Sequence, residues 1–352
     1  MLKENYHVLG IMSGTSLDGI DIAEINFKFS ESRITYTLGV SETIPYPQKW
    51  KKSLSEAISY TENQLKELNT LYTNYLSEVI NLFIKKNTIV SLDAICSHGH
   101  TILHQPEKGV TLQIGNLKAL SENIKQTVVC DFRVQDVKLG GQGAPLVPIG
   151  DQLLFGEYEY CLNLGGFANL SRVMGKNRIA YDICPVNIVL NYYVQKIGLA
   201  YDDRGDIAAT GIIDKELLGN LNNLNFYQDT PPKSLGLEWV KKFIFPLIDA
   251  KNIEIKDILR TFIEHIAIQI SKQIKGGGTV LSTGGGVYND FLLQRIEAYS
   301  ENKISIPSKR LVEFKEALIF GLLGVLKLRG EVNCLASVTG ASKDHSSGII
   351  FN

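Results

Sequence analysis

Residues 10–21 read GIMSGTSLDGID, and they place a turn rich in glycine and hydroxyl side chains between two segments with strand character. Apolar residues fill much of 7–13 before the turn, and residues 20–27 alternate apolar and polar side chains with a period of two. A turn of this composition presents backbone N–H groups and hydroxyls that can converge on phosphate oxygens. It contains no lysine and leads into a strand, so it is not a Walker loop. Considered alone, the turn fits a phosphate site and an ordinary hairpin equally well.

The composition narrows the class of protein before any further motif is considered. The chain has 352 residues, 44% of them hydrophobic, which is enough for a sizeable core and predicts about two domains. Its 36 basic and 37 acidic residues nearly cancel, so no basic field indicates a nucleic acid or an anionic membrane as partner. We find no signal-peptide segment at the N-terminus, no apolar run long enough to cross a bilayer, and no CxxC pair among the five cysteines. We therefore expect a reduced, cytoplasmic α/β protein.

Strand and helix patterns along the first half of the chain predict one domain. We expect strands at 7–13, 20–27, 33–40, 92–96 and 127–130, and helices at 48–60 and 61–86. In the second helix, leucine and aromatic residues recur at helical spacing, so one of its faces should pack on the sheet.

The same order of elements returns after a connector rich in glycine and proline, LGGQGAPLVP at 139–148. A strand runs into a glycine turn at 160–166, and we expect further strands at 168–173, 178–181 and 279–282. We expect helices at 187–198, 213–223, 254–275, 289–299 and 313–329. This order predicts a duplication, with one glycine turn of each half at a cleft between the halves. The expected domains are 1–150, completed by the C-terminal segment 313–352, and 151–312.

Three strand ends that carry glycine, at 10–19, 162–166 and 282–286, match the pattern of the superfamily of sugar kinases, heat-shock chaperones and actin. Within it the chain resembles the anhydro-N-acetylmuramic acid kinase family. The resemblance rests on motifs in collinear order over almost the whole length: GIMSGTSLDGID at 10–21, SHG-T at 97–101, TLQIG at 111–115, DFR at 131–133, LGGQGAPLVP at 139–148, LNLGG-ANLS at 162–171, PKS at 232–234, GGG--N at 284–289, EAL at 316–318 and SVTGAS at 337–342. It implies a duplicated two-domain, actin-like ATPase fold with ATP in a cleft between the domains.

The resemblance also implies a reaction and residues for it. Such kinases open the internal acetal of 1,6-anhydro-N-acetylmuramic acid with water and phosphorylate O6 with ATP and Mg²⁺, which gives N-acetylmuramate 6-phosphate in the recycling of cell-wall sugars. The nucleotide is expected to contact Gly14, Thr15, Ser16, Leu17, Asp18, Gly19, Ile20 and Asp21 in the first turn, Gly165 and Gly166 in the second, and Gly284, Gly285, Gly286 and Asn289 in the adenosine loop. The sugar is expected to contact His98, Arg133, Asn169 and Asn187. The resemblance further implies a homodimer.

The base that activates the water falls on Asp182 by the family motif Asp-Thr-Gly-Pro-Gly-Asn, since a carboxylate suits this role. Here the motif reads Asp182, Ile183, Cys184, Pro185, Val186 and Asn187. Both glycines are lost, and glycine normally lets a backbone approach closely, so we expect either the ligand or the loop to move. The alternative for Asp182, placed at a strand end before a proline-started helix, is a helix N-cap.

Two other polar residues also allow two interpretations each. Asp18, near the tip of the first turn, is a candidate ligand of Mg²⁺ on the ATP phosphates, although turns also use aspartate for local hydrogen bonds. Arg133 is suited to the lactyl carboxylate of a muramic sugar, or to a salt bridge with Asp131 or Asp136.

The histidines of HGHTILH, which are His98, His100 and His104, invite a metal interpretation. Their spacing crosses a strand end and no fourth ligand is nearby, so we do not predict a metal site there. Only His98 belongs to a family motif, and we expect it to line the substrate pocket.

Two other functions compete with this kinase. The altered segment 183–186 leaves room for a kinase of another amino sugar, and the superfamily includes binding proteins that are switched by a nucleotide. A binding protein would not need Asp182, and the chain has no additional domain to hold a polypeptide.

Overall fold

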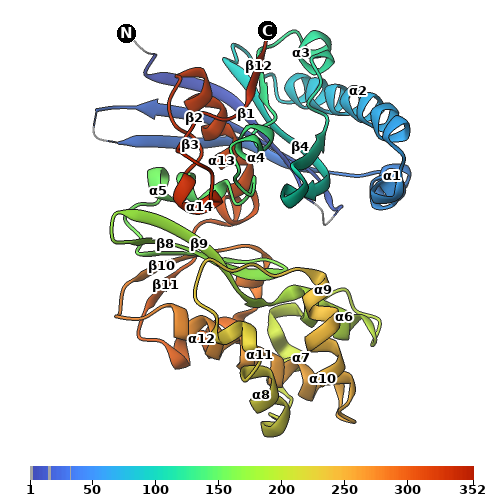
Figure 1. Ribbon diagram of the computed structural model, residues 1–352, viewed down its shortest axis with the longest axis vertical. Helices are drawn as coiled ribbons and strands as arrows, with labels where there is room; N and C mark the ends of the chain where they lie inside the picture. The colour runs from blue at the N-terminus through green and yellow to red at the C-terminus, as the bar shows by residue number, and fades with distance from the viewer. Residues whose placement is uncertain (1–2, 15–16, 32) are drawn as a thin grey trace. The chain divides into compact units, whose positions relative to one another are not determined.

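The computed structural model of the protein describes residues 3–14, 17–31 and 33–352, so Thr15 and Ser16 of the predicted phosphate turn lie outside the described residues. The chain divides into two compact units, which Figure 1 colours by position along the chain. Unit 1 contains Met1–Leu154 and Phe314–Asn352, and unit 2 contains Phe155–Glu313. Each unit combines helices with a sheet, and the predicted α/β class is confirmed.

The sheet of unit 1 mixes antiparallel and parallel strands. Its strands are β1 (Asn5–Ser13), β2 (Gly19–Phe29), β3 (Ile34–Pro45), β4 (Ala94–Gln105), β5 (Val110–Ile114), β6 (Val128–Cys130) and β12 (Ile349–Phe351). Their order is β3-β2-β1-β4-β6-β12, with β5 beside β4. The first three strands are antiparallel neighbours, β1, β4 and β6 run parallel, and β12 returns antiparallel to β6. The last residues of the chain thus complete the sheet that the first residues begin.

Helices pack on both faces of this sheet because alternate residues of a strand point to opposite sides. The helices of this unit are α1 (Gln48–Glu56), α2 (Glu62–Lys86), α3 (Ala119–Ile124), α4 (Val134–Lys138), α5 (Val147–Leu154), α13 (Lys309–Leu328, from Phe314 onward) and α14 (Ala336–Thr339). Leu9 and Ile11 of β1 share a core cluster with apolar residues of α2, and Figure 1 shows α2 beside α3. Gly10, between them, faces α13: a Cβ atom there would lie 2.0 Å from the carbonyl oxygen of Ala317. Glycine at this position therefore allows the helix and the strand to approach closely.

The sheet of unit 2 repeats the order of the first. Its strands are β7 (Tyr160–Leu164), β8 (Phe167–Met174), β9 (Asn177–Pro185), β10 (Thr279–Thr283) and β11 (Lys303–Ser305). Their order is β9-β8-β7-β10-β11, in which β7, β8 and β9 are antiparallel neighbours and β7, β10 and β11 run parallel. The shared order and strand directions confirm the predicted duplication.

The helices of unit 2 supply most of its core. They are α6 (Asn187–Gln195), α7 (Asp206–Ala209), α8 (Lys215–Asn222), α9 (Leu237–Trp239), α10 (Phe245–Asp249), α11 (Ile255–Gln273) and α12 (Asp290–Tyr299). Phe262 and Ile266 of α11 share a cluster with Leu162 of β7 and Val280 of β10. Among the described residues, none of the helices in either unit combines the length and the apolar character needed to cross a bilayer.

Several elements extend beyond their predicted limits. β4 continues to Gln105 rather than ending at residue 96, because its second half pairs with β5. β9 continues to Pro185 rather than 181, because Phe167 at the start of β8 pairs with it. Helix α5 crosses the predicted boundary at residue 150, and α13 begins at Lys309 rather than 313.

Candidate active site

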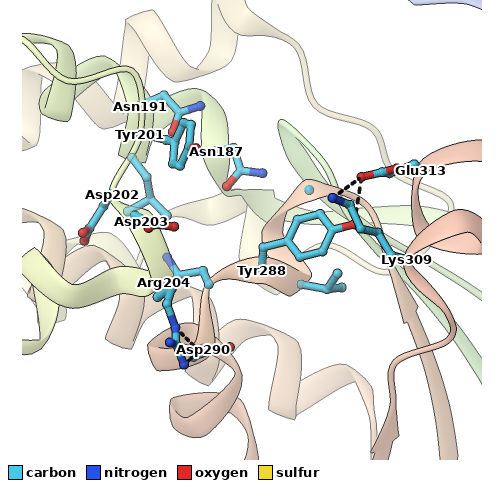
Figure 2. Close-up of a pocket in the computed structure, with 14 residues that line it drawn as sticks. Asn187, Asn191, Tyr201, Asp202, Asp203, Arg204, Tyr288, Asp290, Lys309 and Glu313 are labelled. Carbon is cyan, nitrogen blue, oxygen red and sulfur yellow. Dashed lines mark hydrogen bonds and ion pairs between the residues drawn. The ribbon is translucent and has the colours of Figure 1, made fainter. Parts of the chain in front are cut away.

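A cavity of about 640 Å³ lies within unit 2, and its size is in the range of about 300–1,000 Å³ that holds small ligands and cofactors. It is lined by the start of α6, the segment 201–204, the turn before α12 and the start of α13. The lining residues are Asn187, Leu190, Asn191, Tyr201, Asp202, Asp203, Arg204, Gly285, Val287, Tyr288, Asn289, Asp290, Lys309 and Glu313. Figure 2 shows Asn191 and Tyr201 on one side of this cavity, with Lys309 and Glu313 on the opposite side.

Two glycine turns predicted to contact ATP are neighbours in unit 2. β7 and β10 run parallel, with Asn163 opposite Thr283, so both turns follow the carboxyl ends of adjacent strands. Gly284 has a φ of 84°, and a Cβ atom there would lie 2.5 Å from Oδ1 of Asn163 and 2.8 Å from the carbonyl oxygen of Leu164. A side chain at this position would be strained in conformation and would also collide with β7. The turn at Gly165 and the loop from Gly284 are therefore packed against each other.

Asn187, a predicted sugar contact, lies at the wall of the cavity. Its backbone N–H donates to the carbonyl oxygen of Gly165 at 3.3 Å, and its Nδ2 donates to the carbonyl oxygen of Leu164 at 3.3 Å. Both bonds fix the start of α6 against the glycine turn after β7. The structure thus brings Asn187 together with Gly285 and Asn289, which are predicted nucleotide contacts.

The segment 201–204 contributes to the cavity although no pattern in the sequence indicates it. Arg204 and Gly205 have φ values of 58° and 79°, so the backbone turns sharply here. A Cβ atom at Gly205 would lie 2.3 Å from Oδ1 of Asn289, and the absent side chain lets this segment approach the predicted adenosine loop. Arg204 forms an ion pair of 2.5 Å with Asp290, drawn as a dashed line in Figure 2. One Arg-Gly pair in a loop is too common in sequences to indicate such a site.

Two tyrosines add exposed rings to the lining of the cavity. Tyr201 is 62% exposed and Tyr288 is 43% exposed. The hydroxyl of Tyr288 donates to Oε1 of Glu313 at 3.3 Å, and Nζ of Lys309 lies 3.6 Å from the same oxygen. Ring surface next to hydrogen-bonding groups suits a ligand with a flat apolar part and a polar part.

Asp182 lies inside β9 and opposite Asn169 of β8, so the structure brings the predicted base next to a predicted sugar contact. Its Oδ2 accepts a hydrogen bond from the backbone N–H of Leu235 at 2.7 Å, and its own N–H donates to the carbonyl oxygen of Lys233 at 3.0 Å. Burial raises the pKa of the Asp182 carboxyl above its usual range, although the bond from Leu235 lowers it. A carboxylate with a raised pKa accepts a proton more readily near neutral pH.

The alternative that Asp182 caps a helix is wrong. β9 continues to Pro185, and α6 begins at Asn187 with Val186 at its N-cap position. Cys184 and Val186, which stand where the family motif has glycine, are fully buried in the core of unit 2. Because these two side chains point into the core, they do not by themselves require the ligand or the loop to move.

In unit 1 the structure brings Arg133 and His98 together. Nε of Arg133 donates to Nε2 of His98 at 2.8 Å, and Nη1 donates to the carbonyl oxygen of Gly143 at 2.6 Å. Nδ1 of His98 donates to the carbonyl oxygen of Gly99 at 2.9 Å, and burial, reinforced by the charge of Arg133, lowers the pKa of this histidine well below its usual range. Both partners of the guanidinium are therefore neutral. Among the described residues, the alternative salt bridge to a neighbouring aspartate is not found.

The first glycine turn is shorter than the motif that predicts it. The described residues between β1 and β2 are Gly14, Leu17 and Asp18. Residues 19–21 already belong to β2, where Ile20 is fully buried and Oδ1 of Asp21 accepts a hydrogen bond from the hydroxyl of Thr43 at 2.6 Å. Asp18 is exposed, as a ligand of a phosphate-bound ion must be.

His100 and His104 have local partners of their own. Nδ1 of His100 lies 2.8 Å from the hydroxyl of Ser13, and Nδ1 of His104 lies 3.1 Å from the hydroxyl of Thr111. Within the part of the chain that the structure describes, neither ring joins a group of side chains placed to share a metal ion.

Comparison with known proteins gives matches over the whole chain. A family model described as anhydro-N-acetylmuramic acid kinase matches residues 6–352. Proteins of that name are similar to this chain in Mannheimia succiniciproducens, with 33% identity over 100% of both chains, and in Pseudomonas syringae pv. syringae, with 32% identity over 99% of both chains. Among solved structures, a gluconate kinase from Lactobacillus acidophilus is similar with a TM-score of 0.47 and 11% sequence identity, over 97% of this chain and 93% of that one.

Proposed function

The chain belongs to the anhydro-N-acetylmuramic acid kinase family, and on that premise we propose that it acts on 1,6-anhydro-N-acetylmuramic acid. In the proposed reaction, water opens the internal acetal of the sugar and O6 receives the γ-phosphoryl group of ATP. The product is N-acetylmuramate 6-phosphate, formed in the cytoplasm during the recycling of cell-wall sugars.

The environment of Asp182 is the observation that carries this proposal. The carboxylate is half-buried, its Oδ2 accepts a hydrogen bond from the N–H of Leu235, and among the described residues its Oδ1 has no hydrogen-bond partner. Oδ1 takes a proton from water, and the water oxygen forms a bond to the anomeric carbon. The bond from that carbon to O6 breaks, and the electron pair on O6 attacks the γ-phosphorus as ADP leaves. The proton ends on Asp182 and the water oxygen becomes the anomeric hydroxyl.

ATP is proposed to bind through unit 2, with its adenosine in the 640 Å³ cavity. The exposed rings of Tyr201 and Tyr288 offer surfaces for the base, and the backbone at Gly165 and Gly166 receives the phosphates. The close packing of Gly284 against β7 supports this arrangement, because it keeps the cavity and the phosphate turn at a fixed separation.

Mg²⁺ is proposed to reach the ATP phosphates through Asp18. The exposed carboxylate of this residue fits an ion that keeps most of its water ligands and binds proteins through one or two carboxylates. When bound, the ion neutralises charge on the transferred phosphoryl group.

The lactyl carboxylate of the sugar is proposed to bind Arg133. The guanidinium is oriented by His98 and Gly143, and neither partner offsets its positive charge. A planar guanidinium that is already oriented is suited to a carboxylate. Arg133 belongs to unit 1, whereas Asp182 belongs to unit 2.

Incubation with ATP and a panel of amino sugars, followed by mass analysis of the products, tests this function. We expect 1,6-anhydro-N-acetylmuramic acid to gain the mass of one water and one phosphoryl group. A gain of phosphoryl alone would indicate an ordinary sugar kinase. Nucleotide binding without any sugar product would indicate a nucleotide-switched binding protein.

A further inference from the structure

Three buried side chains of unit 1 that the proposed reaction does not use converge on one small volume. Asp136 belongs to α4. Cys334 and His345 lie in the C-terminal segment, where their backbones form an isolated antiparallel β-bridge. They are 0%, 1% and 5% exposed, and one ligand-type atom of each lies within 4.8 Å of the other two. Oδ1 of Asp136 lies 3.1 Å from Sγ of Cys334 and 3.6 Å from Nε2 of His345. An oxygen, a sulfur and a nitrogen atom therefore meet in the protein interior.

The ring of His345 is oriented so that a lone pair faces this volume. Its Nδ1 lies 3.1 Å from the carbonyl oxygen of Lys343, which can only accept, so Nδ1 carries the ring proton. In the tautomer with its proton on Nδ1, Nε2 carries a lone pair. This nitrogen is buried and, within the described residues, has no hydrogen-bond partner. A buried polar atom without a partner is rare, whereas metal-binding histidines usually donate their other ring N–H to a carbonyl or a carboxylate.

We propose that Asp136, Cys334 and His345 bind one zinc ion or a divalent cation of similar chemistry. A mixed set of oxygen, sulfur and nitrogen ligands suits Zn²⁺. Tetrahedral zinc with bonds of about 2.0–2.3 Å separates its ligand atoms by about 3.3–3.7 Å. Two of the three observed separations, 3.1 and 3.6 Å, lie close to this range, and the third, between Sγ of Cys334 and Nε2 of His345, is at most 4.8 Å. A water molecule would take the fourth position.

The charges of this cluster also favour a divalent cation. One carboxylate and one thiolate neutralise Zn²⁺, so the occupied site carries no net charge into the interior. Without metal, Oδ1 of Asp136 accepts hydrogen bonds from the thiol of Cys334 at 3.1 Å and from the hydroxyl of Thr339 at 2.7 Å. On binding, the S–H bond breaks, the proton leaves to solvent and a bond from sulfur to zinc forms, with no change of oxidation state.

Such an ion would have a structural role next to the proposed substrate-binding arginine. It would join the C-terminal segment to α4, and the other oxygen of Asp136, Oδ2, accepts the N–H of Gly143 at 2.6 Å. The carbonyl oxygen of Gly143 is the group that holds Nη1 of Arg133. The proposed site therefore supports the backbone that orients Arg133 and does not touch the reacting atoms.

Two variants remove a ligand atom while they keep the hydrogen bonds of the metal-free cluster. Cys334→Ser retains a hydroxyl that donates to Asp136. His345→Asn retains an N–H that can reach the carbonyl oxygen of Lys343, but it lacks the atom that faces the cluster. We expect both variants to fold and to bind Zn²⁺ at least about 100-fold more weakly than the unaltered protein.

The matched control is Cys130→Ser in the same unit, because Sγ of Cys130 lies 3.8 Å from the carbonyl oxygen of Asn116 and a serine hydroxyl keeps that contact. The full-length protein, prepared without a histidine tag, is titrated with Zn²⁺ against a chelator and its bound metal is counted by mass spectrometry. Co²⁺ is then added as a coloured substitute for zinc.

We expect about one zinc ion per chain, a near-ultraviolet thiolate absorption with Co²⁺, and a zinc-dependent rise of the unfolding temperature in the unaltered protein and the control. Both ligand variants should lose all three. The proposal is overturned if the saturated protein retains no zinc after gel filtration, or if Cys334→Ser and His345→Asn bind zinc as tightly as the control.

Discussion

Replacement of Asp182 by asparagine tests the proposed base most directly. Asparagine has nearly the same shape, and its side-chain oxygen can still accept the N–H of Leu235, which lies 2.7 Å from Oδ2 of the aspartate. What the variant loses is the proton acceptor. Loss of a general base costs about 10²- to 10⁴-fold in turnover, which corresponds to about 2.7–5.5 kcal/mol of barrier height.

The folded protein should tolerate this change. Because the backbone hydrogen bond is kept, we expect the free energy of unfolding to fall by less than about 1 kcal/mol. The pH dependence provides a second test. Burial raises the pKa of Asp182 in the folded state, so the folded state holds this proton to a higher pH than the unfolded state does. This carboxyl therefore destabilises the fold as the pH rises through the interval between the two pKa values, and Asp182→Asn should remove that pH dependence.

Two assays are needed: steady-state phosphorylation of the anhydro sugar, and ATP affinity by calorimetry. The first is run between about pH 4 and 9, so that the titration of a carboxyl with a raised pKa can be followed. In the unaltered protein, turnover should decline on the acid side with a midpoint above the usual pKa of aspartate. Asp214→Asn is the matched control, because Asp214 accepts the N–H of Leu217 at 2.8 Å in the same unit and only caps α8. Asparagine is an equally good cap, so this control should remain fully active.

Two results would refute the reasoning about Asp182. Turnover of Asp182→Asn near that of the control, in folded protein, would place the base elsewhere. Loss of ATP affinity together with turnover would make Asp182 a structural or metal-linked residue, since it does not line the 640 Å³ cavity proposed for the nucleotide.

Three further predictions concern the parts of the proposed site that would hold the ligands. Arg133→Lys should raise KM for the sugar about 10- to 100-fold and leave KM for ATP unchanged, because one ammonium cannot reproduce the two bonds to His98 and Gly143. Steady-state kinetics in both substrates test this, and a parallel rise in KM for ATP would contradict it. Gly284→Ala should lower the free energy of unfolding by about 1–3 kcal/mol, whereas Gly285→Ala should not, because a Cβ atom at Gly285 meets nothing within 4 Å. Denaturant unfolding measures this, and equal midpoints for the two variants would show that the collision at Gly284 relaxes. Sugar and a non-hydrolysable ATP analogue together should compact the protein in small-angle scattering, as closure that excludes water requires, and an unchanged radius would count against it.

The sequence predicts the strands near the glycine turns best. Residues 20–27 alternate apolar and polar side chains with one interruption at Ile22 and Ala23, and β2 includes all of them. The limits of β4 and β9 were harder to predict, because HGHTILHQ at 98–105 and CP at 184–185 lack a strand pattern. These residues are strands because β5 and β8 supply backbone partners, and that pairing is a long-range property.

Long-range contacts that a sequence pattern does not reveal also explain why the sequence indicates some residues of the candidate site and not others. Gly165 and Gly284 follow predicted strands, and their proximity follows from the parallel pairing of β7 with β10. Tyr201 and Arg204 lie in a loop without periodicity, and they reach the cavity because Gly205 fits against Asn289. The helix-cap interpretation of Asp182 failed because a proline was read as the start of a helix, whereas Pro185 is the last residue of a strand.

The return of the chain from unit 2 to unit 1 sets the order in which the protein can fold as it is synthesised. A nascent chain that has just passed residue 313 contains every residue of unit 2, but it lacks most of α13 and all of β12. At that moment the face of β1 at Gly10 has no helix on it, and the edge of β6 has no partner. Unpaired strand edges and uncovered apolar faces are the features that chaperones bind and that aggregate. On the ribosome, the middle of this chain is therefore ready to fold before its beginning, because residues 1–154 complete their unit only after residues 314–352 have been made.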